Sequence, residues 1–100
     1  MKLIKARSGE TTPLSKENFS DFKTVQGARM AQKDSAVYAE SPRRYKLFCD
    51  TAHEIYIISG AGFIKWARGE LPFTAGDCFC AEEIGEYELN GNCVFEVIKK

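Results

Sequence analysis

Two apolar, β-prone runs in the middle of the chain, each bounded by glycine, constrain the fold more than any other feature. The first, residues 53–59, is rich in β-branched and aromatic side chains and stops at Gly60. A run of this kind predicts a buried strand that ends in a tight turn. The second, residues 77–81, follows Gly76 and predicts a short barrel strand. The chain is therefore expected to be organised around residues 51–81.

Similar β-prone runs fill most of the remaining sequence. Nine of them follow one another at intervals of about ten residues: 28–32, 36–40, 45–50, 53–59, 62–67, 70–74, 77–81, 86–89 and 93–98. Turn residues separate them, including residues 60–62 and the Asn-Gly step at residues 90–92, which is a strong hairpin signal. The pattern predicts an all-β domain, a small antiparallel β-barrel or jelly roll, which it fits far better than a βαβ arrangement.

The N-terminal residues carry different signals. The segment Lys2–Ala6 alternates polar and apolar residues and predicts an edge strand, and residues 11–13 mark a break. Ser15 then has the character of a helix cap before a short helical turn, with its hydroxyl accepting from backbone amides. Phe19 and Phe22, three residues apart, are expected to share the inner face of that turn and to plug one end of the barrel.

Length and charge narrow the domain organisation and the partners. A chain of 100 residues forms one domain, residues 1–26 leading into a barrel at 27–99. Fourteen basic residues balance fourteen acidic ones, so net charge gives no case for nucleic acid or an anionic membrane as a partner. The N-terminus has only Leu3 and Ile4 as an apolar pair, which is too short for a signal peptide or a membrane span. A cytoplasmic protein is expected.

Four cysteines raise the question of disulfides or a metal site. They are Cys49, Cys78, Cys80 and Cys93. Without an export signal, reduced thiols acting as small buried hydrophobes are expected. Cys78 and Cys80 are two apart in a predicted strand and should share a face, whereas zinc ribbons use turn-borne pairs with two intervening residues.

The first of the two central runs resembles the first signature motif of the cupin superfamily. That motif has two histidines one residue apart, then a glutamate, and a glycine after six more residues. Taking Gly60 as the glycine places His53 at the glutamate position, with Cys49 and Leu47 at the two histidine positions. The resemblance implies a cupin-like barrel whose usual metal ligands are mostly substituted.

The second run resembles the second cupin motif, which begins with a glycine matched by Gly76. In this register Glu82 stands for the motif's proline, Ile84 for its glycine and Tyr87 for its histidine. The resemblance covers residues 27–99. Residues 58–98 are also similar to the C-terminal cupin lobe of mannose-6-phosphate isomerases, and the ethanolamine-utilisation cupins have a similar pattern. In the isomerases this lobe is not the place of the metal-dependent reaction, so these comparisons imply a fold more than a reaction.

The resemblance and strand alternation together define a candidate site. Because side chains alternate along a strand, Cys49 and His53 should both face the barrel interior, where the second motif brings Tyr87. His53 is the only histidine and is the natural proton carrier near neutral pH, although a histidine satisfied by Tyr87 or a carbonyl is equally consistent with the sequence. A one-residue register slip would instead turn Glu54 and Asp50 inward.

Two further residues are candidates for ligand contact. Trp66 either lines a ligand cavity or packs in the core or at a dimer interface. Arg44, from the pair Arg43-Arg44, would suit a phosphate group. Adjacent strand residues point in opposite directions, so at most one of these arginines is expected to reach a pocket.

Two functions from different classes follow from these residues. The first is a binding module without the usual metal, holding a small polar or sugar-like ligand through residues drawn from His53, Tyr87, Cys49, Trp66 and Arg44. The alternative is a metal-dependent enzyme, isomerase- or oxygenase-like, in which Cys49, His53 and Tyr87 hold zinc, iron, copper, manganese or nickel. Either form is expected to be a homodimer paired through a sheet edge.

Overall fold

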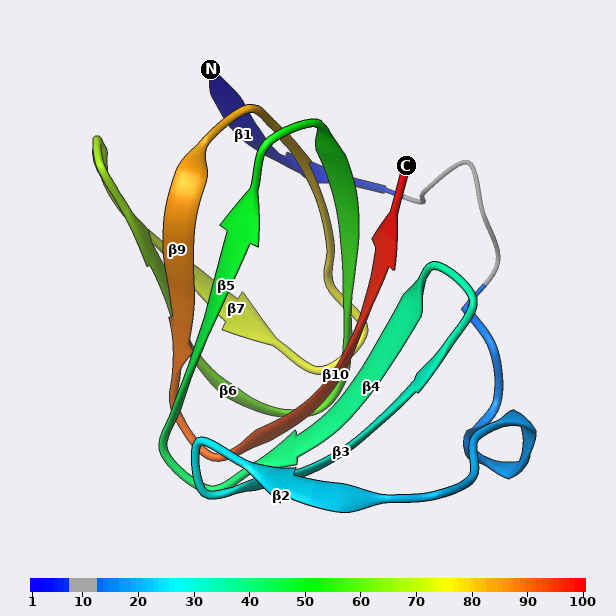
Figure 1. The fold of residues 1–100 in the computed structure, drawn as a ribbon. Helices are drawn as coiled ribbons and strands as arrows, with labels where there is room; N and C mark the ends of the chain where they lie inside the picture. Colours follow the sequence, from blue (N-terminus) through cyan, green and yellow to red (C-terminus); the bar gives the residue numbers. More distant parts are fainter. Residues whose placement is uncertain (8–12) are drawn as a thin grey trace.

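The chain forms an antiparallel β-barrel whose strands bury alternate side chains (Figure 1). The structure is a computed structural model that describes residues 1–7 and 13–100. The described elements are β1 (Lys2–Ala6), η1 (Lys16–Asn18), β2 (Lys23–Val25), β3 (Ala28–Lys33), β4 (Ala36–Ser41), β5 (Arg44–Cys49), β6 (Ala52–Trp66), β7 (Gly69–Thr74), β8 (Cys78–Glu82), β9 (Gly85–Asn90) and β10 (Cys93–Lys99). The predicted fold class, an all-β antiparallel barrel with a short N-terminal helical turn, is confirmed.

Two sheets share one long strand. Sheet A has the order β1-β8-β6-β10-β4-β3-β2, and in sheet B the order is β5-β9-β6-β7. The first half of β6 pairs with β8 and β10, and its second half pairs with β7 and β9. Strand β6 therefore closes one side of the barrel, while β3 and β5 face each other across the other side without pairing.

The barrel interior is the main hydrophobic core. It is built from the inward positions of both sheets, with Ile55, Phe79, Phe95 and Leu89 completely buried. Burying a side chain of this size stabilises a fold by about 1.5–3 kcal/mol. The alternation that predicted these strands is thus the alternation that fills the barrel.

The outer face of sheet A forms a second, smaller core. Phe19 packs on Tyr38 with 5.4 Å between ring centroids, and Phe22 meets the same ring edge-on at 5.9 Å. Arg29 lies over the Phe22 ring at 4.4 Å. The prediction that these phenylalanines plug a barrel end is therefore wrong. They cover an apolar outer face of β4 and β10, which includes the buried Ile98.

Gly60 does not end a strand, so the predicted turn at residues 60–62 is also wrong. Strand β6 continues from Ala52 to Trp66 through a bulge, because Ser59 pairs with Val94 while Ile57 pairs with the next residue, Phe95. Gly60 has φ +88°, and a Cβ there would collide with the carbonyl oxygen of Asn92. Because Gly60 has no Cβ, its backbone can lie against that of residues 92 and 93, and β6 can bend from sheet A into sheet B at this point.

The Asn-Gly step at residues 90–92 joins different sheets. The strands on either side of it, β9 and β10, belong to sheets B and A respectively and do not pair with each other. The expected hairpin is replaced by a corner between the sheets, and Gly91 has φ +138° there.

The N-terminal predictions have mixed outcomes. Strand β1 forms, pairing with β8 at the edge of sheet A. The helical turn is a 3-10 turn in which the Ser15 hydroxyl donates to a Glu17 carboxylate oxygen at 3.2 Å and caps no backbone amide. Residues 11 and 12 of the predicted break lie outside the described part of the chain. The free edge of β1 leaves the homodimer as a prediction.

All four cysteines carry free thiols. Cys78 and Cys80 share the outer face of sheet A as predicted, paired with Tyr56 and Glu54 respectively. In the described residues, no helix has the length and apolar character needed to span a membrane.

Candidate functional site

Strands β6 and β9 bring His53 and Tyr87 together inside the barrel. The His53 Nδ1 atom and the Tyr87 hydroxyl share a hydrogen bond of 2.8 Å, and the two rings meet edge to face at 5.8 Å. His53 is 3% exposed and Tyr87 1%. The predicted inward orientation of His53 is correct. The register pairs His53 with Ala81 and places Glu54 on the opposite face, so the one-residue slip does not occur.

Cys49, at the end of β5, completes the predicted trio. Its thiol is fully buried and donates weakly to the carbonyl oxygens of Thr51 (3.7 Å) and Ala81 (3.8 Å). It lies close enough to Tyr87 to help raise the pKa of the phenol. A thiol, an imidazole and a phenol therefore meet at the barrel end where β5 and β10 finish and β6 begins, at the top of Figure 1.

Burial keeps the histidine and the tyrosine neutral. Desolvation lowers the pKa of His53, the positive charge of Lys99 lowers it further, and Asp50 opposes both. Desolvation also raises the pKa of Tyr87 well above its ordinary value, and the nearby Cys49 adds to the shift. Because neither group is charged near neutral pH, the neutral pair can donate a hydrogen bond to a ligand or accept one from it.

A cavity of about 290 Å³ opens into the barrel where β3 and β5 face each other unpaired. Its lining residues are Met30, Gln32, Val37, Tyr45, Lys46, Leu47, Phe48 and Lys99. Two of them are cross-strand neighbours of the hydrogen-bonded histidine and tyrosine: Leu47 lies opposite Tyr87, and Lys99 lies opposite His53. Neither His53 nor Tyr87 lines this cavity itself, so the pair lies next to it through these two neighbours.

The gap between β3 and β5 is held at one end by a side chain. Gln26, in the tight turn between β2 and β3, has φ +54°. Its amide donates to the Lys46 carbonyl at 2.9 Å and accepts from the Lys46 N–H at 2.8 Å. A side-chain amide here replaces a strand partner for β5, so the sheets are tied together while the space beyond Gln26 stays open.

Two polar groups in this cavity have no partner among the described residues. Tyr45 is only 5% exposed, yet its hydroxyl makes no hydrogen bond to any described residue, and burial alone raises its pKa. Lys99 forms no ion pair with the described part of the chain. Lys99 is solvent-exposed and Tyr45 is buried, and both line the cavity, so both can donate to a polar ligand or to ordered water there.

A larger cavity, of about 440 Å³, lies over the ends of β6 and β8. It is lined by Ala52, His53, Glu54, Cys80, Ala81, Glu82 and Lys100. Its buried carboxylate is already neutralised, because Lys100 Nζ lies 3.1 Å from Glu54 Oε1. In this larger cavity the buried carboxylate and the lysine form an ion pair. In the cavity between β3 and β5, Lys99 and the Tyr45 hydroxyl have no partner among the described residues.

Strand alternation alone did not reveal the buried acids of the outer face. Glu54 was expected to face outward, and it does, yet it is 3% exposed. Glu96 is completely buried, with Oε2 accepting from the Leu14 N–H at 2.7 Å and Oε1 without a partner among the described residues. Burial raises the pKa of Glu96. The available signal was the run of apolar residues around Glu96, which indicates a strand covered on both faces.

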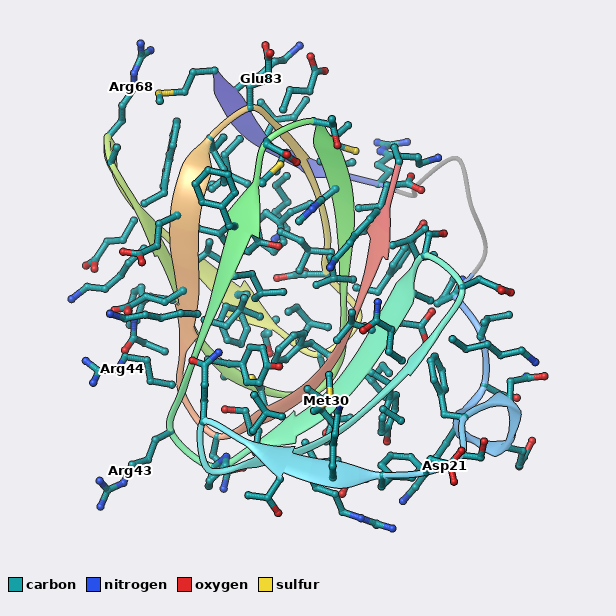
Figure 2. The ribbon with its side chains drawn as sticks, viewed as in Figure 1. Asp21, Met30, Arg43, Arg44, Arg68 and Glu83 are labelled. Carbon is teal, nitrogen blue, oxygen red and sulfur yellow. The ribbon has the colours of Figure 1, made fainter. Side chains whose placement is uncertain are left out.

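The remaining candidates lie in different places. Trp66 is half-buried against the barrel core, at the end of β6, where it pairs with Gly69 of β7. Arg44 is at the opposite end of β5 from Cys49, where it lines a separate cavity with Arg43 and Asn90. Figure 2 shows both arginines pointing away from the barrel. The structure therefore places Arg44 away from the His53–Tyr87 end, and a ligand role for Trp66 stays a prediction.

The donor chemistry of the trio does not fit a metal centre as it stands. The His53 Nδ1 atom is already bonded to Tyr87, and the Cys49 thiol donates to two carbonyls. Among the described residues, no three His, Cys, Asp or Glu side chains are grouped closely enough to hold a metal ion.

Solved structures share this architecture. Streptomyces Pac13, whose structure is titled a unique nucleoside dehydratase, superposes with a TM-score of 0.68 at 17% identity, over 87% of this chain and 80% of that one. Mannose 6-phosphate isomerase from Bacillus subtilis matches with a TM-score of 0.65 at 18% identity over 77% of this chain, which spans only 27% of the isomerase. The plu4264 protein of Photorhabdus luminescens matches with a TM-score of 0.64 at 11% identity, over 91% and 87% of the two chains. No family model and no curated protein sequence matches the chain.

Proposed function

We propose that this chain, whose fold is that of the small barrels it superposes on, binds a small polar or sugar-like molecule in the cavity between β3 and β5. The bound molecule would lie beside the hydrogen-bonded His53–Tyr87 pair, whose cross-strand neighbours line the cavity. The observation that carries the proposal is the combination of this neutral pair with a cavity lined by its two cross-strand neighbours, Leu47 and Lys99.

The chemistry of the cavity supports a small ligand of mixed polarity. Ligand sites are typically apolar clefts with a few placed polar groups, and about 290 Å³ is at the small end of their range. Met30, Val37 and Leu47 supply apolar walls, while Tyr45 and Lys99 supply hydrogen-bond donors. Sugars and nucleosides combine an apolar ring face with hydroxyl groups and suit such a lining.

The structural neighbours agree with this class of ligand. Variants of Streptomyces Pac13 with a histidine or a tyrosine replaced were solved with uridine. Their fold accommodates a nucleoside, and the present chain has a histidine and a tyrosine hydrogen-bonded inside the same type of barrel. A nucleoside or a simple sugar is therefore the first class to test.

The direct test is titration of the labelled protein with uridine and with mannose, followed by amide NMR. We expect saturable shifts at residues 30–32, 45–48 and 99, and weaker binding in the His53→Gln variant. Shifts confined to the cavity over β6 and β8, or no saturable shift with any sugar or nucleoside at millimolar concentration, would overturn the proposal.

The second candidate, a metal-dependent isomerase- or oxygenase-like enzyme, is favoured by one observation. Cys49, His53 and Tyr87 do lie together at one barrel end. To bind zinc, iron, copper, manganese or nickel they would have to break the hydrogen bonds that now occupy them, and the phenol would have to ionise against its raised pKa. Elemental analysis of untagged protein decides this: a stoichiometric transition metal, lost in the Cys49→Ala, His53→Ala double variant, would replace the binding proposal with the enzyme.

A further inference from the structure

We propose that the ligand of the cavity between β3 and β5 carries an oxyanion, a phosphate or a carboxylate, which Lys99 and Tyr45 bind. The inference rests on the proposed function and goes further by naming the charge of the ligand. It follows from three features of the lining: a cation and a tyrosine hydroxyl that have no partner in residues 1–7 and 13–100, and no Asp or Glu of those residues in the lining.

The unpaired cation is Lys99, at the end of β10. It lines the cavity, forms no ion pair with the described residues and lies opposite His53 in the sheet. Its positive charge lowers the pKa of the His53 ring inside the barrel. A second lysine, Lys46, also lines the cavity from the edge of β5. A cation that has no anion within the protein can gain a charge-assisted bond only from a ligand or solvent.

The unpaired hydroxyl is that of Tyr45. The residue is 5% exposed, and its ring packs edge-on against Phe95 at 5.6 Å, which fixes the ring. The hydroxyl has no hydrogen-bond partner among the described residues. Since burial raises its pKa, the hydroxyl keeps its proton and can donate to an anionic oxygen.

In the part of the chain that the structure describes, no carboxylate that would repel an anion lines the cavity. Its polar members are Gln32, Tyr45, Lys46 and Lys99, and among the described residues no Asp or Glu lines it. Asp50, whose charge acts on His53, does not line the cavity. The cavity over β6 and β8 differs, because Glu54 and Glu82 line it. An anion is therefore directed to the first cavity by charge as well as by free donors.

The experiment compares matched ligands that differ in charge, by calorimetry at low ionic strength. The pairs are uridine with uridine 5′-monophosphate, mannose with mannose 6-phosphate, and glucose with glucuronate. We expect the anionic member to bind about tenfold or more tightly, as a charge-assisted hydrogen bond implies. We also expect added salt to reduce this advantage. The phosphate and carboxylate pairs show which oxyanion is preferred.

Three variants test which residues are responsible. Lys99→Met should remove the preference for the anion, so that the anionic and the neutral member of each pair bind with the same affinity. Lys65→Met is the matched control, because Lys65 is an exposed strand lysine that does not line the cavity. Tyr45→Phe should weaken binding of the anion without lowering stability, because its hydroxyl has no described protein partner to lose.

The outcomes separate this inference from the proposed function. If neutral sugars or nucleosides bind in the cavity and their anionic counterparts bind no more tightly, the inference is wrong and the proposed function stands. An anionic preference that survives Lys99→Met unchanged also refutes the inference. If neither member of any pair shifts residues 30–32, 45–48 or 99, both proposals fail.

Discussion

Replacing Tyr87 with phenylalanine tests the hydrogen bond on which the candidate site is built. The hydroxyl is buried with its residue at 1% exposure and bonds to His53 Nδ1 at 2.8 Å. Phenylalanine keeps the ring and its packing but leaves that nitrogen without a partner inside the barrel. Because His53 is itself 3% exposed, water has little access to compensate.

The expected cost follows from the burial of both partners. Leaving a buried polar atom unsatisfied costs about 1–3 kcal/mol. For a domain of this size, each kcal/mol lowers the melting temperature by about 4–8 °C. The matched control is Tyr45→Phe, which deletes the same atom from another buried tyrosine of the barrel core, where the hydroxyl has no partner among the described residues. That change should alter stability by less than about 0.5 kcal/mol.

The assay is urea unfolding of the wild type and both variants at pH 7, with thermal unfolding as a second measure. Equal stability of wild type and Tyr87→Phe would refute the hydrogen bond. So would a Tyr45→Phe variant that loses as much as Tyr87→Phe, because the two hydroxyls would then not differ as the structure requires.

Three further predictions concern the strand bend, a buried acid and the electrostatics of the site. Gly60→Ala should be several kcal/mol less stable in urea than Gly27→Ala, since both residues have positive φ but only Gly60 would collide with backbone; equal losses would contradict the bend in β6. Burial raises the pKa of Glu96, so the folded chain holds this proton to higher pH than the unfolded chain, and stability from it is lost as pH rises above 4.5. The free energy of unfolding of Glu96→Gln should therefore rise relative to that of the wild type between pH 5 and pH 8. If urea unfolding gives a difference between the two proteins that does not change with pH, the prediction is wrong. Lys99→Met should raise the pKa of His53 in a ring NMR titration, because a nearby cation lowers it now; an unchanged value would show that Lys99 does not act on the ring.

Most of the fold could be predicted because alternating side chains and turn residues are local signals. The edge strand Lys2–Ala6 and the inward position of His53 both follow from alternation. The bend at Gly60 could not be predicted, because a glycine that ends a strand and one that lets a strand approach another backbone look alike in sequence. The outer core formed by Phe19 and Tyr38 was missed for a similar reason, since it depends on where the N-terminal segment packs.

The candidate site was predicted in part. Motif spacing brought Cys49, His53 and Tyr87 together, and the structure places them at one barrel end. Tyr45 and Lys99 were not identified, because the cavity they line arises from two strands that remain unpaired, and pairing between distant strands is a tertiary property.

Nitrogen NMR of the His53 ring tests the central claim most directly, because the chain has a single histidine and hence one set of ring signals. In a pH titration we expect a midpoint below 6.5, the ordinary value, and one ring nitrogen with a hydrogen-bond shift that disappears in Tyr87→Phe. A midpoint at or above 6.5, with ring signals that Tyr87→Phe leaves unchanged, would place the imidazole outside the barrel and contradict the account.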